Sequence, residues 1–109
     1  MISDILSDDY QLLTDIKTVN QEYKGIYATD LLSQAIQDGK SSNLLITIIS
    51  NPNAIGVAIM MDFPGVIISA NKPVTQMMID KANEEEIAII QTKLKTHEVI
   101  IDLFKRGLL

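Results

Sequence analysis

Six consecutive residues of the sequence read Leu44-Leu45-Ile46-Thr47-Ile48-Ile49, and Ser50-Asn51-Pro52 follow them directly. A short run of apolar and β-branched residues is typical of a parallel strand that is buried on both faces. Asn51 is a favourable N-cap and Pro52 suits the first position of a helix, so a helix should begin there. This segment therefore predicts one strand-helix unit of a parallel sheet.

The same order of strand and helix recurs on both sides of this unit. Further strands are expected at residues 25–28, 66–69 and 87–90. Asp30 and Thr96 are expected to cap two of the other helices, and Pro73 to open the third. The resulting βαβαβαβα pattern predicts an α/β fold with a largely parallel sheet of about five strands flanked by helices.

The whole chain, residues 1–109, is expected to form a single domain. Its core of strands and helices covers residues 23–107, and residues 1–22 are expected to supply a helical turn, a strand and a loop. Gly39 is expected to end the first helix in a left-handed conformation. The last helix is expected to bury an apolar stripe made of Val99, Ile100, Leu103 and Phe104.

The composition excludes several classes of function. The 109 residues carry a net charge of −5 and no cysteine, so disulfides and thiolate chemistry are excluded. Lysine and arginine are scattered, whereas a nucleic-acid partner requires a basic face. The N-terminus lacks the pattern of a signal peptide, and the apolar stretch 54–61 is far shorter than the roughly 20 residues of a membrane span. We therefore expect a cytoplasmic protein without nucleic-acid or membrane partners.

The turns after the expected strands are the candidate ligand site. Ligands of open parallel sheets bind beyond the carboxyl ends of the strands, and helix N-termini there attract anions. Lys72 would be the natural phosphate contact of a nucleotide or another small anion. Ordinary helix capping explains the same residue types equally well. The candidate ligand-binding residues are Asp30, Asn51, Asn53, Asn71, Lys72, Thr96 and Glu98.

The expected helix at residues 53–61 is apolar on nearly every side, so one face of a sheet cannot cover it. A partner subunit is the simplest second cover, which predicts a homodimer. The candidate interface residues are Ile55, Val57, Ile59, Met60 and Met61.

The sequence contains no recognised catalytic motif, and we expect no enzymatic activity, cofactor or metal site. His97 is the only histidine, and a polar residue in the first turn of a helix is its simpler interpretation. A metal-dependent enzyme that uses Asp30, His97 and Glu98 ranks last among the hypotheses, because these residues do not form a recognised set of metal ligands.

Seven short segments of the chain form an ordered set of motifs: Gly25-Ile26-Tyr27-Ala28-Thr29-Asp30-Leu31-Leu32-Ser33, Leu45-Ile46-Thr47-Ile48, Asn53-Ala54-Ile55, Val57-Ala58, Gly65-Val66-Ile67-Ile68, Lys72-Pro73 and Thr96-His97-Glu98. The order of these motifs resembles the DRTGG domain family, which is similar to the N-terminal domain of HPr kinase/phosphorylase. The resemblance covers roughly residues 23–107. Two features depart from that family: Pro52-Asn53 stands near the place of its Asp-Arg pair, and Ser69-Ala70-Asn71 replaces its Thr-Gly-Gly turn.

This resemblance implies a homodimeric regulatory module that stands alone, whereas other members are attached to phosphotransacetylases or CBS-containing pyrophosphatases. It also makes an adenine nucleotide a plausible ligand by association. The alternative is an interaction protein that docks a partner enzyme and has no small-molecule ligand. The sequence leaves both hypotheses open.

Overall fold

Five strands form the central sheet of the computed structural model, which describes residues 1–109. They lie in the order β1-β5-β4-β3-β2, with β2 to β5 parallel and β1 antiparallel to β5. The predicted α/β fold with a largely parallel sheet is therefore confirmed. The strands are β1 (Tyr10–Leu12), β2 (Ile26–Ala28), β3 (Leu44–Thr47), β4 (Gly65–Ile68) and β5 (Ala88–Thr92).

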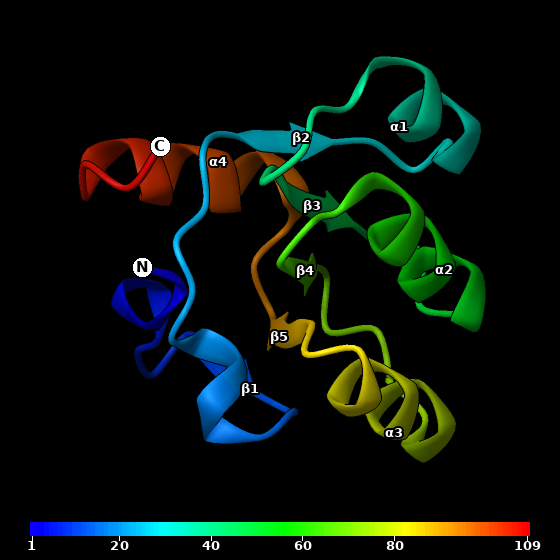
Figure 1. Ribbon diagram of the computed structural model, residues 1–109. Helices are drawn as coiled ribbons and strands as arrows, with labels where there is room; N and C mark the ends of the chain where they lie inside the picture. The colour runs from blue at the N-terminus through cyan, green and yellow to red at the C-terminus, as the bar shows by residue number, and fades with distance from the viewer.

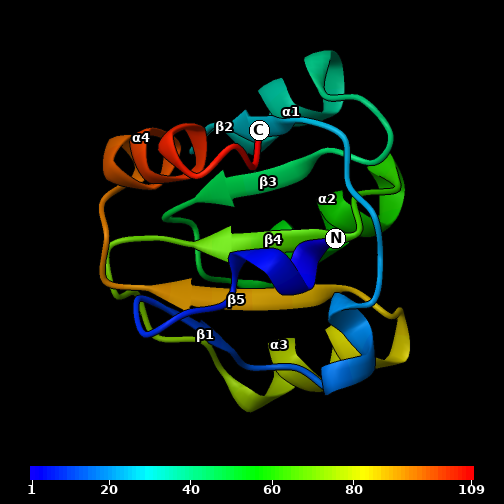
Figure 2. The same ribbon diagram turned by 90° about the vertical axis from the view of Figure 1, so that its left-hand side faces the viewer.

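Helices cover both faces of the sheet (Figures 1 and 2). Helices α1 to α3 lie on one face, whereas α4 and the 3₁₀ helix η1 lie on the other. Because β2 to β5 are neighbours in chain order, each right-handed crossover places its helix on the same face, and the chain changes face only after β5. The helices are η1 (Ile2–Ile5), η2 (Ile16–Val19), α1 (Leu32–Asp38), α2 (Pro52–Met61), α3 (Gln76–Glu84) and α4 (Thr96–Lys105).

The two faces of the sheet pack against separate hydrophobic clusters. Every residue of β3 and β4 is buried, as expected of central parallel strands. Leu45 and Val66 pack in the cluster on the side of α1 to α3, whereas Ile46 and Ile67 pack in the cluster on the side of α4. The sheet is therefore the middle layer of a three-layer domain.

The N-terminal segment belongs to the same domain. Its strand β1 pairs with β5, with Tyr10 opposite Thr92, and its Ile2 and Ile5 are fully buried. The Arg106 guanidinium at the end of α4 donates hydrogen bonds to backbone carbonyl oxygens of this segment. The segment is thus fastened to the last strand and the last helix of the chain.

Asn51 caps α2 as predicted, but three other predicted helix starts are wrong. The N-cap of α1 is Leu31, because the Asp30 carboxylate binds to the end of β3 instead. Helix α3 is capped by Thr75, whose side chain accepts a hydrogen bond from Met78 N, and Pro73 precedes it in the loop. Thr96 is the first residue of α4 and not its cap.

Two further details of the helices differ from the predictions. Gly39 has a φ of −68° and not a left-handed conformation. A Cβ at this position would lie 2.5 Å from the Ala35 carbonyl oxygen and 2.7 Å from the Phe63 ring, so close packing requires the glycine. Phe104 was expected in the buried stripe of α4, but its side chain is 72% exposed.

Candidate functional site

Backbone hydrogen bonds join the loops that follow β4 and β5 at the carboxyl edge of the sheet. The chain leaves β4 toward one face and β5 toward the other, and the crevice between two such loops is the usual ligand site of an open sheet. Here the backbone N–H groups of Ala70 and Asn71 donate to the carbonyl oxygens of Leu94 and Thr92, each at 2.8 Å. These two backbone N–H groups are therefore not available to bind an anion.

Asp30 and Asn51, two of the predicted ligand-binding residues, stabilise the turn between β3 and α2 through side-chain hydrogen bonds. One oxygen of the Asp30 carboxylate accepts hydrogen bonds of 2.9 Å from the Thr47 hydroxyl and from the backbone N–H of Ile48. Asn51 Oδ1 accepts a hydrogen bond of 2.9 Å from the backbone N–H of Asn53. Both side chains therefore have structural partners at this edge.

Thr96 and Glu98 are engaged in the same way at the start of α4. The Thr96 hydroxyl lies 2.7 Å from the Ser69 hydroxyl and ties the loop after β4 to the loop after β5. Glu98 Oε1 accepts a hydrogen bond of 2.9 Å from the backbone N–H of Lys95 and satisfies a free donor of the helix start. Both side chains therefore have structural partners, although Glu98 is exposed.

The other three predicted residues, Asn53, Asn71 and Lys72, are exposed. Asn71 lines a small polar cavity of about 70 Å³ next to Gln91. None of the seven predicted residues other than Asn71 lines any of the five principal cavities. The structure thus brings the predicted residues to one edge of the sheet without forming a shared pocket.

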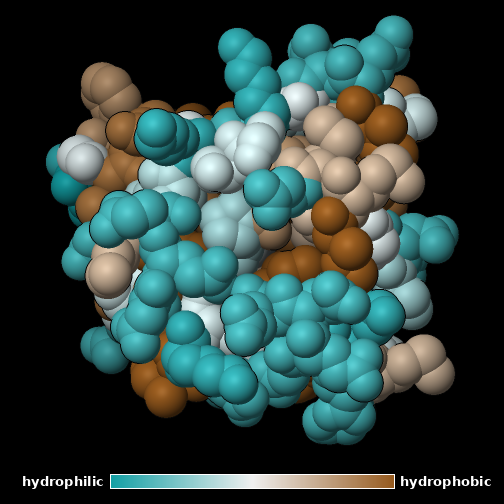
Figure 3. All heavy atoms as spheres, viewed as in Figure 1, coloured by the Kyte–Doolittle hydropathy of each residue, from teal (hydrophilic) through white to brown (hydrophobic).

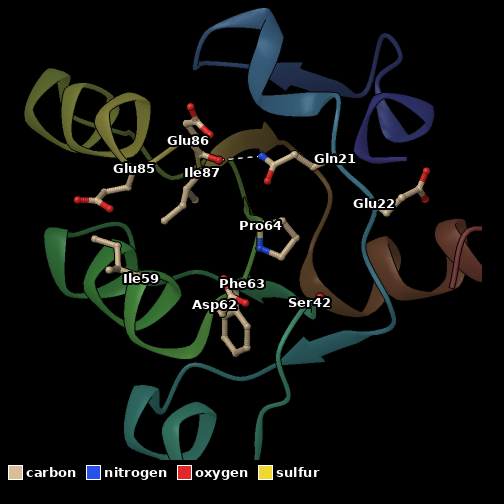
Figure 4. Close-up of a pocket in the computed structure, with 10 residues that line it drawn as sticks. All are labelled: Gln21, Glu22, Ser42, Ile59, Asp62, Phe63, Pro64, Glu85, Glu86 and Ile87. Atoms are coloured by element: carbon tan, nitrogen blue, oxygen red, sulfur yellow. Dashed lines mark hydrogen bonds between the residues drawn. The ribbon is translucent and has the colours of Figure 1, made fainter.

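A larger cavity, of about 250 Å³, lies at the opposite edge of the sheet, where α2 and α3 end (Figure 4). Ile59 and Glu85 extend into the space between these two helices, and Gln21 Nε2 donates to the Glu86 carbonyl oxygen at 2.7 Å. The cavity is lined by Gln21, Glu22, Ser42, Ile59, Asp62, Phe63, Pro64, Glu85, Glu86 and Ile87.

This acidic cavity has no basic side chain in its lining. The negative ends of the α2 and α3 dipoles add to the charge of four carboxylates there, so the cavity repels anions. No group of histidine or acidic side chains in the protein is arranged to hold a metal ion. The sequence predicted no cavity at this edge, because its residues come together only through the αβ turns.

An apolar groove of about 240 Å³ runs between α2 and α3. Met77 beside the groove is 71% exposed, and on α2 the side chains of Ile59 and Met60 are 38% and 66% exposed. Figure 3 shows hydrophobic atoms gathered over α1 and α2 on this side of the molecule. We call the surface made of Gly56, Ile59, Met60 and Met77 the α2–α3 face.

The predicted interface residues divide into two groups. Ile59 and Met60 are exposed and Met61 is half-buried. Ile55 and Val57 are buried in the chain's own core, which corrects their assignment to an interface with another chain. The reason is that α1 and α3 flank α2 and cover both of its sides. Met77 also belongs to the exposed surface, although it is not among the predicted interface residues.

The molecule is thus a single α/β domain with a parallel sheet, an antiparallel edge strand and an apolar outer face. A comparison with protein families matches residues 50–105, which are 56 of the 109 residues, to the family described as HPr Serine kinase N terminus. The chain belongs to this family, and the predicted relationship is confirmed. No curated protein matches the chain. None of its helices combines the length and the apolar character that a bilayer crossing requires.

Proposed function

We propose that this chain is a non-catalytic regulatory module that works as a cytoplasmic homodimer, with the α2–α3 face as the interface. The observation that carries the proposal is the exposure of Met60 and Met77 beside an apolar groove. Methionine is flexible and polarizable, and it is common on surfaces that bind other proteins. Covering this face would remove apolar surface from water, which is the main driving force of association.

Gly56 supports a close crossing of two copies. It lies in the middle of α2, where glycine is less favourable than alanine by about 1 kcal/mol. Gly56 is exposed, and a Cβ added at this position would have no atom within 4 Å. The chain itself therefore does not require the glycine. A second helix that crosses at Gly56 would benefit from the missing side chain.

The charges favour an antiparallel crossing of the two α2 helices. Asp62 caps the C-terminal end of α2, and Glu85 caps the end of α3. The N-terminal end of α2 carries the uncharged Asn51 and Asn53. An antiparallel crossing places the acidic end of each copy near the N-terminal, positive end of the other helix. A parallel crossing would place like charges together.

Light scattering of the purified full chain tests the dimer. We expect about twice the chain mass of 12.1 kDa for the unaltered protein and about the chain mass for Met60→Asp. Ile16→Asp is the matched control, because Ile16 is 71% exposed in η2, outside the α2–α3 face. A monomeric unaltered protein at high concentration would contradict the proposal, and so would a dimeric Met60→Asp.

Sensing of an adenine nucleotide or another small anion is the second candidate function. It is supported by the exposure of Asn53, Asn71 and Lys72 at the carboxyl edge of the sheet. A thermal-shift screen with adenine nucleotides tests it, because a ligand at about 100 times its dissociation constant stabilises a protein by roughly 2.7 kcal/mol. Lys72→Ala should remove the stabilisation. A shift that survives this substitution would exclude Lys72 as the anion contact.

A further inference from the structure

Helix α4 lies on the face of the sheet opposite α2 and α3 (Figure 2), and two of its large apolar side chains are exposed. Phe104 is 72% exposed, the highest value among the large hydrophobic residues, and Ile101 is 50% exposed. Val99 and Leu103 on the other side of the helix are fully buried. Ile101 and Phe104 therefore have no role in the core. In the proposed dimer this side of the molecule stays accessible.

Lysines flank these two residues in the sequence, with Lys93 and Lys95 before them and Lys105 after them. Residues 93–106 hold four of the nine basic residues but two of the fourteen acidic residues of the chain. Lys95 and Lys105 at the two ends of α4 are exposed and form no ion pair, and neither does Lys93. This distribution is notable in a protein with a net charge of −5.

The two acidic residues of α4 offset this charge only in part, because one faces two lysines at the start of the segment and the other faces two basic residues at its end. Glu98 accepts a hydrogen bond from the backbone N–H of Lys95. Asp102 accepts hydrogen bonds from Tyr10 and Arg106. The outward side of α4 is therefore apolar at its centre, and basic residues outnumber acidic residues by two to one at each end.

We infer that the α4 face, defined as Lys95, Ile101, Phe104 and Lys105, docks an acidic segment of a partner protein that carries a large apolar side chain. The apolar side chain covers Ile101 and Phe104, and carboxylates on both sides of it meet the lysines. Exposed aromatic residues are frequent anchors of interfaces, and complementary charges steer the partner and fix its register.

A protein segment fits this face better than a lipid surface or another copy of the chain. Two apolar side chains on a helix of ten residues give little insertion into a bilayer, and the net charge of −5 is repelled by anionic lipid. Docking of the acidic residues of a second copy onto α4 would be a head-to-tail contact, which closes into a ring or continues into an open assembly.

Selection from a phage-displayed library of random short peptides on the immobilised full chain tests the inference. We expect the selected peptides to combine several acidic residues with one aromatic or large aliphatic residue. Fluorescence anisotropy of the strongest peptide should show binding that weakens by about tenfold in Phe104→Ser. Lys95→Glu and added salt should also weaken binding, because the charges are exposed.

Met77→Ser is the matched control, because Met77 is as exposed as Phe104 but lies on the other face of the sheet. It should leave peptide binding unchanged. Phe104→Ser should keep the mass of the unaltered protein in light scattering, which separates this inference from the proposed dimer. The inference is overturned by selected peptides without acidic residues, or by equal binding to Phe104→Ser. Binding to phosphatidylglycerol vesicles in place of peptides, or a mass that grows without limit with concentration, overturns it as well.

Discussion

The Tyr10 hydroxyl donates a hydrogen bond of 2.8 Å to the Asp102 carboxylate and so joins the edge strand β1 to helix α4. The Arg106 guanidinium pairs with the same carboxylate and lies 5.7 Å from the centre of the Tyr10 ring. Tyr10 and Asp102 are 92 positions apart, and their contact connects the first strand of the chain to its last helix.

Removal of the Tyr10 hydroxyl should weaken this connection without emptying the core. We expect Tyr10→Phe to lower the free energy of unfolding by about 1–2 kcal/mol, because one hydrogen bond to a charged acceptor is lost. Urea denaturation measures the change. Tyr27→Phe is the control, since the Tyr27 hydroxyl bonds to Asp38 in an exposed position. An equal effect of the two substitutions would contradict the role given to Tyr10.

Alkaline pH should destabilise the protein through Tyr10 and Tyr23. Burial raises the pKa of the Tyr10 phenol above its usual value of 10.0, and the hydrogen bond to Asp102 raises it further. Burial likewise raises the pKa of Tyr23. A tyrosine whose pKa is higher in the folded state than in the unfolded state stabilises the fold fully below pH 10, and this contribution is lost as the pH rises. Urea denaturation at several pH values should show a smaller alkaline loss for Tyr10→Phe.

The turn after β4 should become more stable with glycine. Ala70 and Asn71 have φ values of 59° and 56°, a left-handed conformation that costs most residues roughly 1–2 kcal/mol. We expect Ala70→Gly to raise the free energy of unfolding by about 1 kcal/mol, since the greater flexibility of unfolded glycine offsets part of the gain. Thermal unfolding measures it. Ala28→Gly in β2 should have the opposite sign, and a destabilised Ala70→Gly would mean that the Ala70 methyl group has a packing role.

Substitution of Gly56 should separate the stability of the chain from its association. Gly56→Ala should raise the unfolding free energy of dilute, monomeric protein by about 1 kcal/mol, because alanine favours the helix and space is open for its methyl group. The same methyl group would lie in the proposed crossing, so the dimer dissociation constant should rise by about tenfold. Sedimentation equilibrium measures that constant. An unchanged dissociation constant would show that the two copies do not cross at Gly56.

The strands and helices could be predicted where the signal is local. The apolar run of residues 44–49 predicts a strand and Asn51 predicts a helix start without reference to distant residues, and β3 and α2 form there. The side of α4 that is buried was harder to predict. Each residue turns a helix by about 100°, and Phe104 is one residue past the buried Leu103. The pattern of apolar residues did not reveal that Phe104 lies outside the core.

The candidate site could not be predicted to the same extent, because its polar residues have partners that are distant in the sequence. Asp30 bonds to Thr47, and Thr96 lies against Ser69. An aspartate or a threonine can bind either a ligand or a neighbouring loop, and the sequence does not show which of the two it contacts. The exposure of Met77 likewise depends on how α3 packs beside α2, which no local pattern records.

The pairing of β1 with β5 also constrains the order in which the molecule can assemble. Strands β2 to β5 are neighbours in the sequence and in the sheet, so each can be added as soon as the chain has made it. Tyr10 pairs opposite Thr92, and closing so long a loop is slower than the local steps. During synthesis β1 therefore has to wait until β5 has left the ribosome. Until then the free edge of β5 and the core residues that η1 and β1 cover stay exposed, and uncovered strand edges and apolar surface of this kind promote aggregation.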